Sequence, residues 1–171
     1  MKQMLLAGLL TLAAVSTSAS SEVPDAIAVS GESLVARLHA EGAQIYDCKA
    51  GASGQLAWQF REPIATLIEG GKTVGHHYAG PQWEAGPHWE LTDGSIVAGN
   101  IVGQARGATA QDILQLKIEA TSHAGKGRLS DVTTVLRLDT KGGVAEGPCP
   151  AAGALLSVPY SADYAFYRKA E

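Results

Sequence analysis

Hydrophobic and polar residues alternate along much of this chain with the two-residue period of half-buried β-strands. The clearest case is 114–121, where Leu, Leu, Ile and Ala alternate strictly with Gln, Lys, Glu and Thr. Residues 132–139 repeat the alternation after a glycine-containing connection, so the two segments are predicted to pair as one antiparallel ribbon. Residues 43–48 and 56–61 predict a second hairpin around the turn-rich segment 49–54.

Less regular segments complete the predicted set of strands, at 34–39, 64–68, 73–78, 95–102 and 155–167. In the third of these, His76 shares a face with Val74 and Tyr78, so His76 is expected in or near the core and His77 on the opposite face. The fourth is apolar on both faces and is expected to be covered on both sides. In the last, Tyr160, Tyr164 and Phe166 share a face, and the latter two are expected in the core.

Three turn and breaker signals punctuate these strands. Pro63 is expected to end the strand before it, and Pro159 to mark an edge position or a bulge. Asp93-Gly94 predicts a type I′ turn, which needs positive φ at both central residues. With about eight to ten short strands and no long helix, the predicted fold is an all-β, single-domain antiparallel β-sandwich or barrel, between which the pattern does not choose.

The first nineteen residues have the pattern of a secretory signal peptide. Lys2 supplies a positive charge, residues 4–15 form an apolar run, and Thr17-Ser18-Ala19 fits a small-x-small cleavage site. The run is shorter than the roughly 20 residues of a membrane span; the other interpretation is a buried N-terminal helix. The expected organisation is therefore a signal peptide at 1–19, a loose lead-in at 20–32, one all-β domain at 33–168 and a tail at 169–171.

Composition narrows the class of protein. Net charge is −4, charged residues make up 18% and hydrophobic residues 46%, which excludes a disordered chain. The acidic balance and the lack of a basic block argue against a nucleic-acid partner. No long apolar stretch follows Ala19, so no membrane span is expected in the mature chain. We expect an exported protein, either periplasmic or secreted.

The chain has two cysteines, Cys48 and Cys149. An even count together with an export signal favours one disulfide, which would close a loop of 149 − 48 = 101 residues. The alternatives are two free thiols or a metal site, although two cysteines so far apart have no ligand spacing.

A hexapeptide is duplicated in tandem. Residues 79–84 read Ala-Gly-Pro-Gln-Trp-Glu and residues 85–90 read Ala-Gly-Pro-His-Trp-Glu. The Gly-Pro pairs favour a loop. One interpretation is that Trp83 and Trp89 form an exposed aromatic platform. The other, which we favour, is that one Trp packs in the core and the other copy bulges out.

Several motifs together resemble the bacterial and fungal domain-of-unknown-function family 3455. They are Gly-Ala-Gln-Ile-Tyr-Asp-Cys at 42–48, Trp58 with Phe60 and Pro63, Gly-His-His-Tyr-Ala-Gly-Pro at 75–81 with Trp83-Glu84, Asp-Gly-Ser at 93–95, 132–140 with Gly142-Gly143, Cys149, and Val-Pro-Tyr-Ser-Ala-Asp-Tyr-Ala-Phe-Tyr at 158–167. The resemblance covers about residues 33–168. It departs from the family pattern in the second hexapeptide copy and in Ile113-Leu114-Gln115, which replaces a Trp-rich segment. The resemblance implies an exported single domain with two paired cysteines and no established activity.

The candidate chemistry lies in the 76–95 region. His76 and His77 are adjacent on a strand and point to opposite faces, so a metal site is not expected. No dinucleotide-binding motif is present, and no cofactor is expected. The favoured function is a non-catalytic binding or envelope-associated domain with an unknown partner, for which a glycan or an envelope component is a candidate. The alternative is a glycan or ester hydrolase that uses acidic and histidine side chains of the same region. The proposed ligand-binding loop consists of His77, Trp83, Glu84, His88, Trp89 and Asp93.

Overall fold

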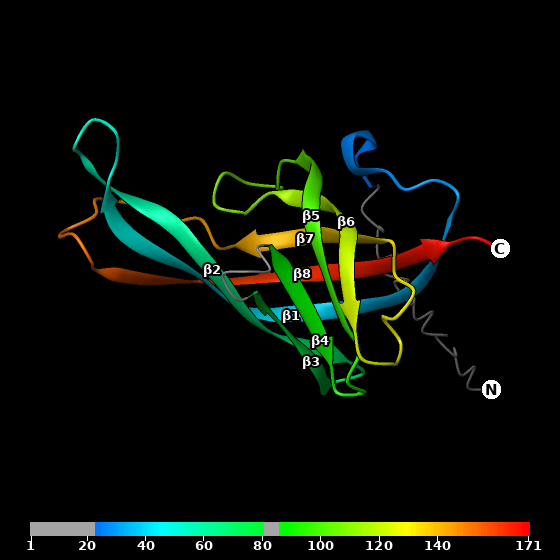
Figure 1. The fold of residues 1–171 in the computed structure, drawn as a ribbon. Coiled ribbons are helices and arrows are strands. Elements are labelled where there is room, and N and C mark those ends of the chain that lie inside the picture. Colours follow the sequence, from blue (N-terminus) through cyan, green and yellow to red (C-terminus); the bar gives the residue numbers. More distant parts are fainter. Residues whose placement is uncertain (1–22, 81–85) are drawn as a thin grey trace, which may run out of the picture.

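The computed structural model describes residues 23–80 and 86–171 and shows a closed antiparallel barrel of eight strands (Figure 1). The strands follow one another around the ring in chain order, and β1 closes it by pairing with β8. The all-β prediction is confirmed, and the ring decides between sandwich and barrel. The strands are β1 Glu32–Ala50, β2 Leu56–Glu69, β3 Lys72–Ala79, β4 Pro87–Leu91, β5 Ile96–Ala105, β6 Gln115–Ala124, β7 Thr134–Gly142 and β8 Leu155–Lys169.

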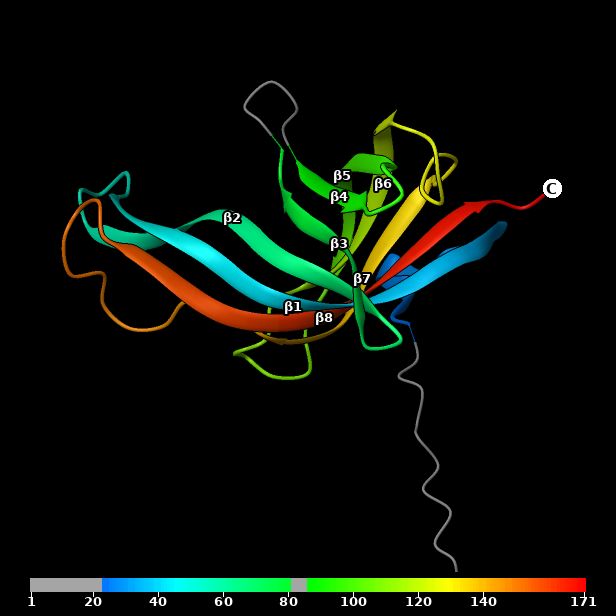
Figure 2. The same cartoon turned by 90° about the horizontal axis from the view of Figure 1, so that it is seen from below.

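The three longest strands, β1, β2 and β8, continue beyond the barrel as a curved three-stranded extension (Figures 1 and 2). Cys48 near the end of β1 is bonded to Cys149 in the connection between β7 and β8. The Cys48 N–H also donates to the Ala154 carbonyl at 2.8 Å, and the Gly153 N–H donates to the Cys48 carbonyl at 2.9 Å. The disulfide therefore holds the β7–β8 connection against the end of the extension.

Pro63 does not end a strand, contrary to the sequence-based prediction, and lies inside β2 opposite Gln44 of β1. The reason is its position, since β2 pairs with β3 only from Ile64 onward. At Pro63 the strand has a neighbour on one side only, so the missing N–H breaks no ladder bond. Pro159 is in the same situation on β8, because the pairing with β7 ends at Tyr160. The expected edge position of Pro159 is thus confirmed.

The main hydrophobic core lies inside the barrel. Its fully buried side chains include Leu38, Leu67, Trp89, Tyr164 and Phe166. The expectation that Tyr164 and Phe166 belong to the core is confirmed.

A smaller apolar cluster lies outside the barrel wall. The 3₁₀ turn η1 (Asp25–Ile27) places Ile27, which is fully buried, against Leu136, Leu138 and Ala165. The sequence before residue 32 has no hydrophobic period, so this segment was expected to be a loose lead-in and its packing was not predicted.

One end of the barrel is closed by the connection between β6 and β7, whose Leu129 and Val132 are fully buried in the core. Polar contacts hold this connection in place. The Asp93 carboxylate accepts hydrogen bonds from the Ser95 N–H at 2.8 Å, the Ser95 hydroxyl at 2.6 Å and the Arg128 N–H at 2.8 Å. Arg128 in turn forms a bidentate ion pair with Glu69 at 2.8 and 2.9 Å.

Two further predictions about strand faces and turns are wrong in detail. Ile101 and Val102 of β5 are each 54% exposed, because register shifts against β6 carry this end of the strand past the core. The turn at Asp93-Gly94 is present, but only Gly94 has a positive φ, 85°. The turn is therefore not type I′. Asp93 instead caps it by accepting from Ser95.

Candidate binding cavity

The barrel interior is not filled at the end where β3 ends and β4 begins, which we call the open end. A cavity of about 250 Å³ lies there, lined from every strand except β1. Phe60 and Ile101 line it while being 56% and 54% exposed, so apolar surface continues from the cavity to its rim. Its other apolar walls are Pro63, Ala79, Pro87, Trp89, Leu116 and Ile118.

A stack of aromatic rings forms the floor of this cavity. His77 of β3 is opposite Trp89 of β4 in the strand register, and their rings stack with centroids 4.8 Å apart and planes 11° from parallel. Tyr164 of β8 reaches both, at 4.9 Å from His77 and 5.3 Å from Trp89. The neighbouring strands β3 and β4 and the distant strand β8 therefore build one aromatic surface.

His77 is an uncharged imidazole with a defined tautomer. It is 2% exposed, and its Nδ1 lies 2.8 Å from the backbone carbonyl of His88. Because a carbonyl can only accept, Nδ1 carries the hydrogen and Nε2 is left as an acceptor. Burial is the main cause that lowers the pKa of His77 to about 3. His77 is thus suited to hydrogen bonding and not to carrying a charge at neutral pH.

Two tyrosines place hydroxyl groups in the same interior. The Tyr164 hydroxyl is 3.4 Å from that of Tyr160, and both side chains are buried. Burial raises the pKa of both phenols, so they stay protonated and can donate hydrogen bonds. The Trp89 indole N–H is also buried, and it has no acceptor among the described residues.

Arg137 of β7 brings a positive charge into this apolar surrounding. It lines the cavity, is opposite Tyr164 in the register, and donates from Nε to the Leu114 carbonyl at 2.9 Å. The other lining cation, Arg61, is paired with Glu62 at 3.0 Å and lies 3.9 Å from Asp47. Among the described residues, no Asp or Glu lines the cavity.

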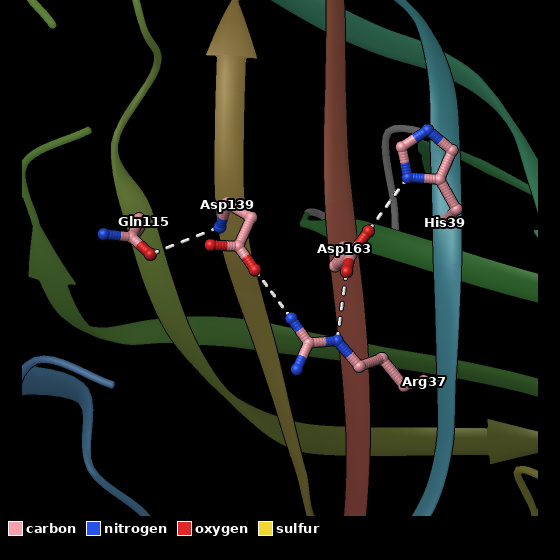
Figure 3. Close-up of polar contacts among 5 residues, drawn as sticks. All are labelled: Arg37, His39, Gln115, Asp139 and Asp163. Carbon is pink, nitrogen blue, oxygen red and sulfur yellow. Dashed lines mark hydrogen bonds and ion pairs between the residues drawn. The ribbon is translucent and has the colours of Figure 1, made fainter. Parts of the chain in front are cut away.

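The carboxylate nearest to Arg137 in sequence is turned to the outside of the barrel. A strand would normally place Asp139 on the same face as Arg137. Here β7 has an extra residue between Leu138 and Lys141 relative to β8, and Asp139 has a φ of 50°. Figure 3 shows the result: Asp139 pairs with Arg37 at 2.6 Å, and Arg37 also binds Asp163 at 3.0 Å.

The loop predicted for the duplicated hexapeptide is wrong for most of its second copy, because Pro87–Leu91 forms β4 and pairs with β3 and β5. The residues of the proposed ligand-binding loop are divided by the structure. His77 and Trp89 line the cavity together. His88 is buried on the other face of the β3–β4 pair, where its ring stacks on Tyr78 at 5.7 Å. Asp93 belongs to the closed end, and Trp83 and Glu84 lie outside the described residues. The interpretation in which one Trp packs in the core holds for Trp89, which is fully buried.

The expected face of β3 is reversed. His76 is exposed and His77 faces the core, because the small side chains at 75 and 79 flank His77 on the inner face and leave room for Trp89 and Leu91. The described residues contain no group of three His, Cys, Asp or Glu side chains that could hold a metal ion.

Sequence reasoning missed Arg137, Arg61, Phe60 and Tyr164 as cavity residues. On β7 the alternation is misleading, because the apolar Leu136 and Leu138 face outward under η1 and Arg137 faces inward. The charged Arg137 on the same strand face as Val135 was the available signal, but its meaning depends on knowing which face is inside the barrel.

Comparison with known families agrees with the motif resemblance. The sequence profile of the family described as "protein of unknown function (DUF3455)" matches residues 29–168. The chain belongs to the DUF3455 family. No curated protein and no solved structure matches this DUF3455 chain. In residues 23–80 and 86–171, no helix is long and apolar enough to cross a membrane.

Proposed function

We propose that this DUF3455 protein is an exported, non-catalytic binding protein that holds a small, largely apolar molecule in the open end of its barrel. The observation that carries the proposal is the cavity of about 250 Å³ with the His77–Trp89–Tyr164 floor. Concave, mostly apolar sites with a few placed polar groups are typical of small-molecule binding. The Cys48–Cys149 disulfide is compatible with an oxidising compartment outside the cytosol.

The size of the cavity limits the ligand. Since a water molecule takes about 30 Å³ of liquid volume, this space suits a molecule of roughly eight to ten non-hydrogen atoms. A longer molecule has a place to extend, because Phe60 contacts Tyr46 edge-on at 5.9 Å on the inner face of the extension. Leu156 is opposite Tyr46 on that same face.

A binding role is also favoured over the hydrolase alternative by what the described candidate residues already contact. The hydrolase needs His77 to act with acidic side chains of the 76–95 region. The Asp93 carboxylate accepts hydrogen bonds from Ser95 and Arg128 at the closed end, and His77 donates Nδ1–H to a backbone carbonyl. These contacts favour a role for His77 in the aromatic floor of a binding site and not in an acid–base pair with Asp93.

The test is isothermal titration of the purified protein with 1-octanol, which has nine non-hydrogen atoms and no charge. We expect one saturable site with a Kd below about 1 mM. Ala79→Trp, which fills the cavity from its wall, should weaken binding at least about tenfold. Leu155→Trp is the matched control, because Leu155 is 60% exposed and does not line the cavity. Equal affinity of the two variants, or no binding by the unaltered protein, would overturn the proposal.

A further inference from the structure

We propose that the ligand of this cavity is a small organic monocarboxylate, with its carboxylate on Arg137 and its apolar body on the aromatic floor. This inference rests on the proposed function and adds the chemical class of the ligand. The first observation is the charge of the site: the protein carries a net charge of −4, yet the cavity lining contains two arginines and no carboxylate among the described residues.

Arg137 is the arginine that can receive an anion. A guanidinium has five N–H donors, and those of Arg137 are used only in part: Nε donates to the Leu114 carbonyl, and the side chain also hydrogen-bonds the neutral Tyr164 hydroxyl. Arg61 is less suited, because Glu62 and Asp47 already lie at 3.0 and 3.9 Å from it. Arg137 has no counter-ion in the part of the cavity lining that the structure describes. A partly buried charge without a counter-ion is costly, so an anionic ligand would be stabilised by electrostatic attraction to this guanidinium.

Among the described residues no carboxylate lines the cavity beside Arg137, and a specific local structure contributes to this. The bulge at Asp139 sends the nearest carboxylate in sequence to the outer face, where Arg37 binds it at 2.6 Å (Figure 3). Without the extra residue, Asp139 would share the inner face with Arg137 and neutralise it. A positive φ at a non-glycine residue is uncommon, and here it separates the two charges.

The surrounding donors also suit a carboxylate. The Tyr164 hydroxyl is a protonated donor in the same wall, and the Trp89 N–H has no acceptor among the described residues. His77, whose imidazole is part of the described lining, presents an acceptor at Nε2 and would repel an oxyanion. The carboxylate is therefore expected at Arg137 and the apolar body over the stacked rings of His77 and Trp89.

The same surroundings argue against a dianion such as a phosphate ester. One unpaired guanidinium balances one negative charge, and a second charge would be left buried against apolar walls such as Ile118 and Leu116. A carboxylate also matches the planar fork of a guanidinium.

The experiment compares octanoate with 1-octanol by isothermal titration at pH 8, where the acid is ionised. The unaltered protein should prefer octanoate by at least about tenfold. Arg137→Met should abolish this preference while still binding 1-octanol, and Arg137→Lys should keep part of it. Asp139→Asn is the control for net charge, because it changes the net charge by one unit in the opposite direction to Arg137→Met and acts on the outer face, so it should leave the preference nearly unchanged.

The outcomes separate the two proposals. If 1-octanol binds but octanoate binds no better, or if Arg137→Met keeps the preference, the carboxylate assignment is overturned and the cavity function stands. If Asp139→Asn raises the preference by as large a factor as Arg137→Met lowers it, general charge explains the preference and the assignment is again overturned. Binding of neither compound by the unaltered protein would overturn both proposals.

Discussion

Arg137 and Asp139 are two residues apart on β7, but their side chains lie on opposite sides of the barrel wall. Arg137 lines the inner cavity, while Asp139 pairs on the outside with Arg37. Neighbours of this spacing on a regular strand share a face, so the separation depends on the bulge between Leu138 and Lys141. One inserted residue thus places Asp139 on the outside, so that Arg137 and Asp139 do not form an ion pair inside the barrel.

The conformation of Asp139 can be tested through stability. Asp139→Asn removes an exposed ion pair and tolerates the φ of 50°, so we expect a loss below about 1 kcal/mol. Asp139→Val puts a β-branched side chain at the same φ and should cost about 1–3 kcal/mol more. Urea unfolding monitored by Trp fluorescence measures both variants. Equal stability of the two would show that the bulge relaxes without strain.

His77 predicts a pH dependence of stability. Its folded pKa of about 3 lies below the ordinary 6.5, so between these values the unfolded chain binds a proton that the folded chain does not. Stability is therefore complete above pH 6.5 and falls as the pH drops through this window, by at most about 1.4 kcal/mol per pH unit. Urea unfolding at several pH values between 7.5 and 5 measures the slope.

The control for that slope is a pair of variants. His77→Phe keeps an aromatic ring against Trp89 and should remove the contribution of His77, whereas His39→Gln, at an exposed site, should leave the slope close to that of the unaltered protein. A slope that survives in His77→Phe would mean that other groups cause it.

Asp93 is expected to stabilise the closed end of the barrel and to take no part in ligand binding. Asp93→Ala removes an acceptor for three hydrogen bonds from Ser95 and Arg128, and should cost about 1–2 kcal/mol after allowance for its exposure. The affinity for 1-octanol should stay within about twofold, since the side chain is absent from the cavity lining. A loss of 1-octanol affinity with unchanged stability would contradict this and show that Asp93 takes part in ligand binding.

Removal of the disulfide is expected to have the largest effect on stability. The bond joins residues 101 positions apart, and replacing both Cys48 and Cys149 by Ser should cost about 2–5 kcal/mol, chiefly through the gained entropy of the unfolded chain. The urea midpoint with and without reductant provides the measurement. The reductant should lower the midpoint of the unaltered protein and have no effect on the double variant. An unchanged midpoint in both would show that the bond contributes little.

The sequence by itself determined the all-β class, most of the strands and the family, but not β4, which lies where a loop was predicted. Period-2 alternation located the strands because a strand must present its two faces in turn, and 114–121 with 132–139 do pair as β6 and β7. The cysteine pair and the family motifs were likewise readable without coordinates. Pro63 shows the limit of such local signals, because its effect depended on whether β2 had one neighbour or two at that point.

Only the tertiary structure decided which face of each strand is the inside. Alternation separates two faces but does not orient them when both carry apolar residues, as on β7, where Leu136 packs under η1 and Val135 faces the core. Closure of β8 onto β1 made one side of every strand interior, and the bulge at Asp139 then shifted the alternation by one residue. The cavity with Arg137, His77 and Trp89 therefore follows from ring closure and register, which are long-range properties that no local pattern encodes.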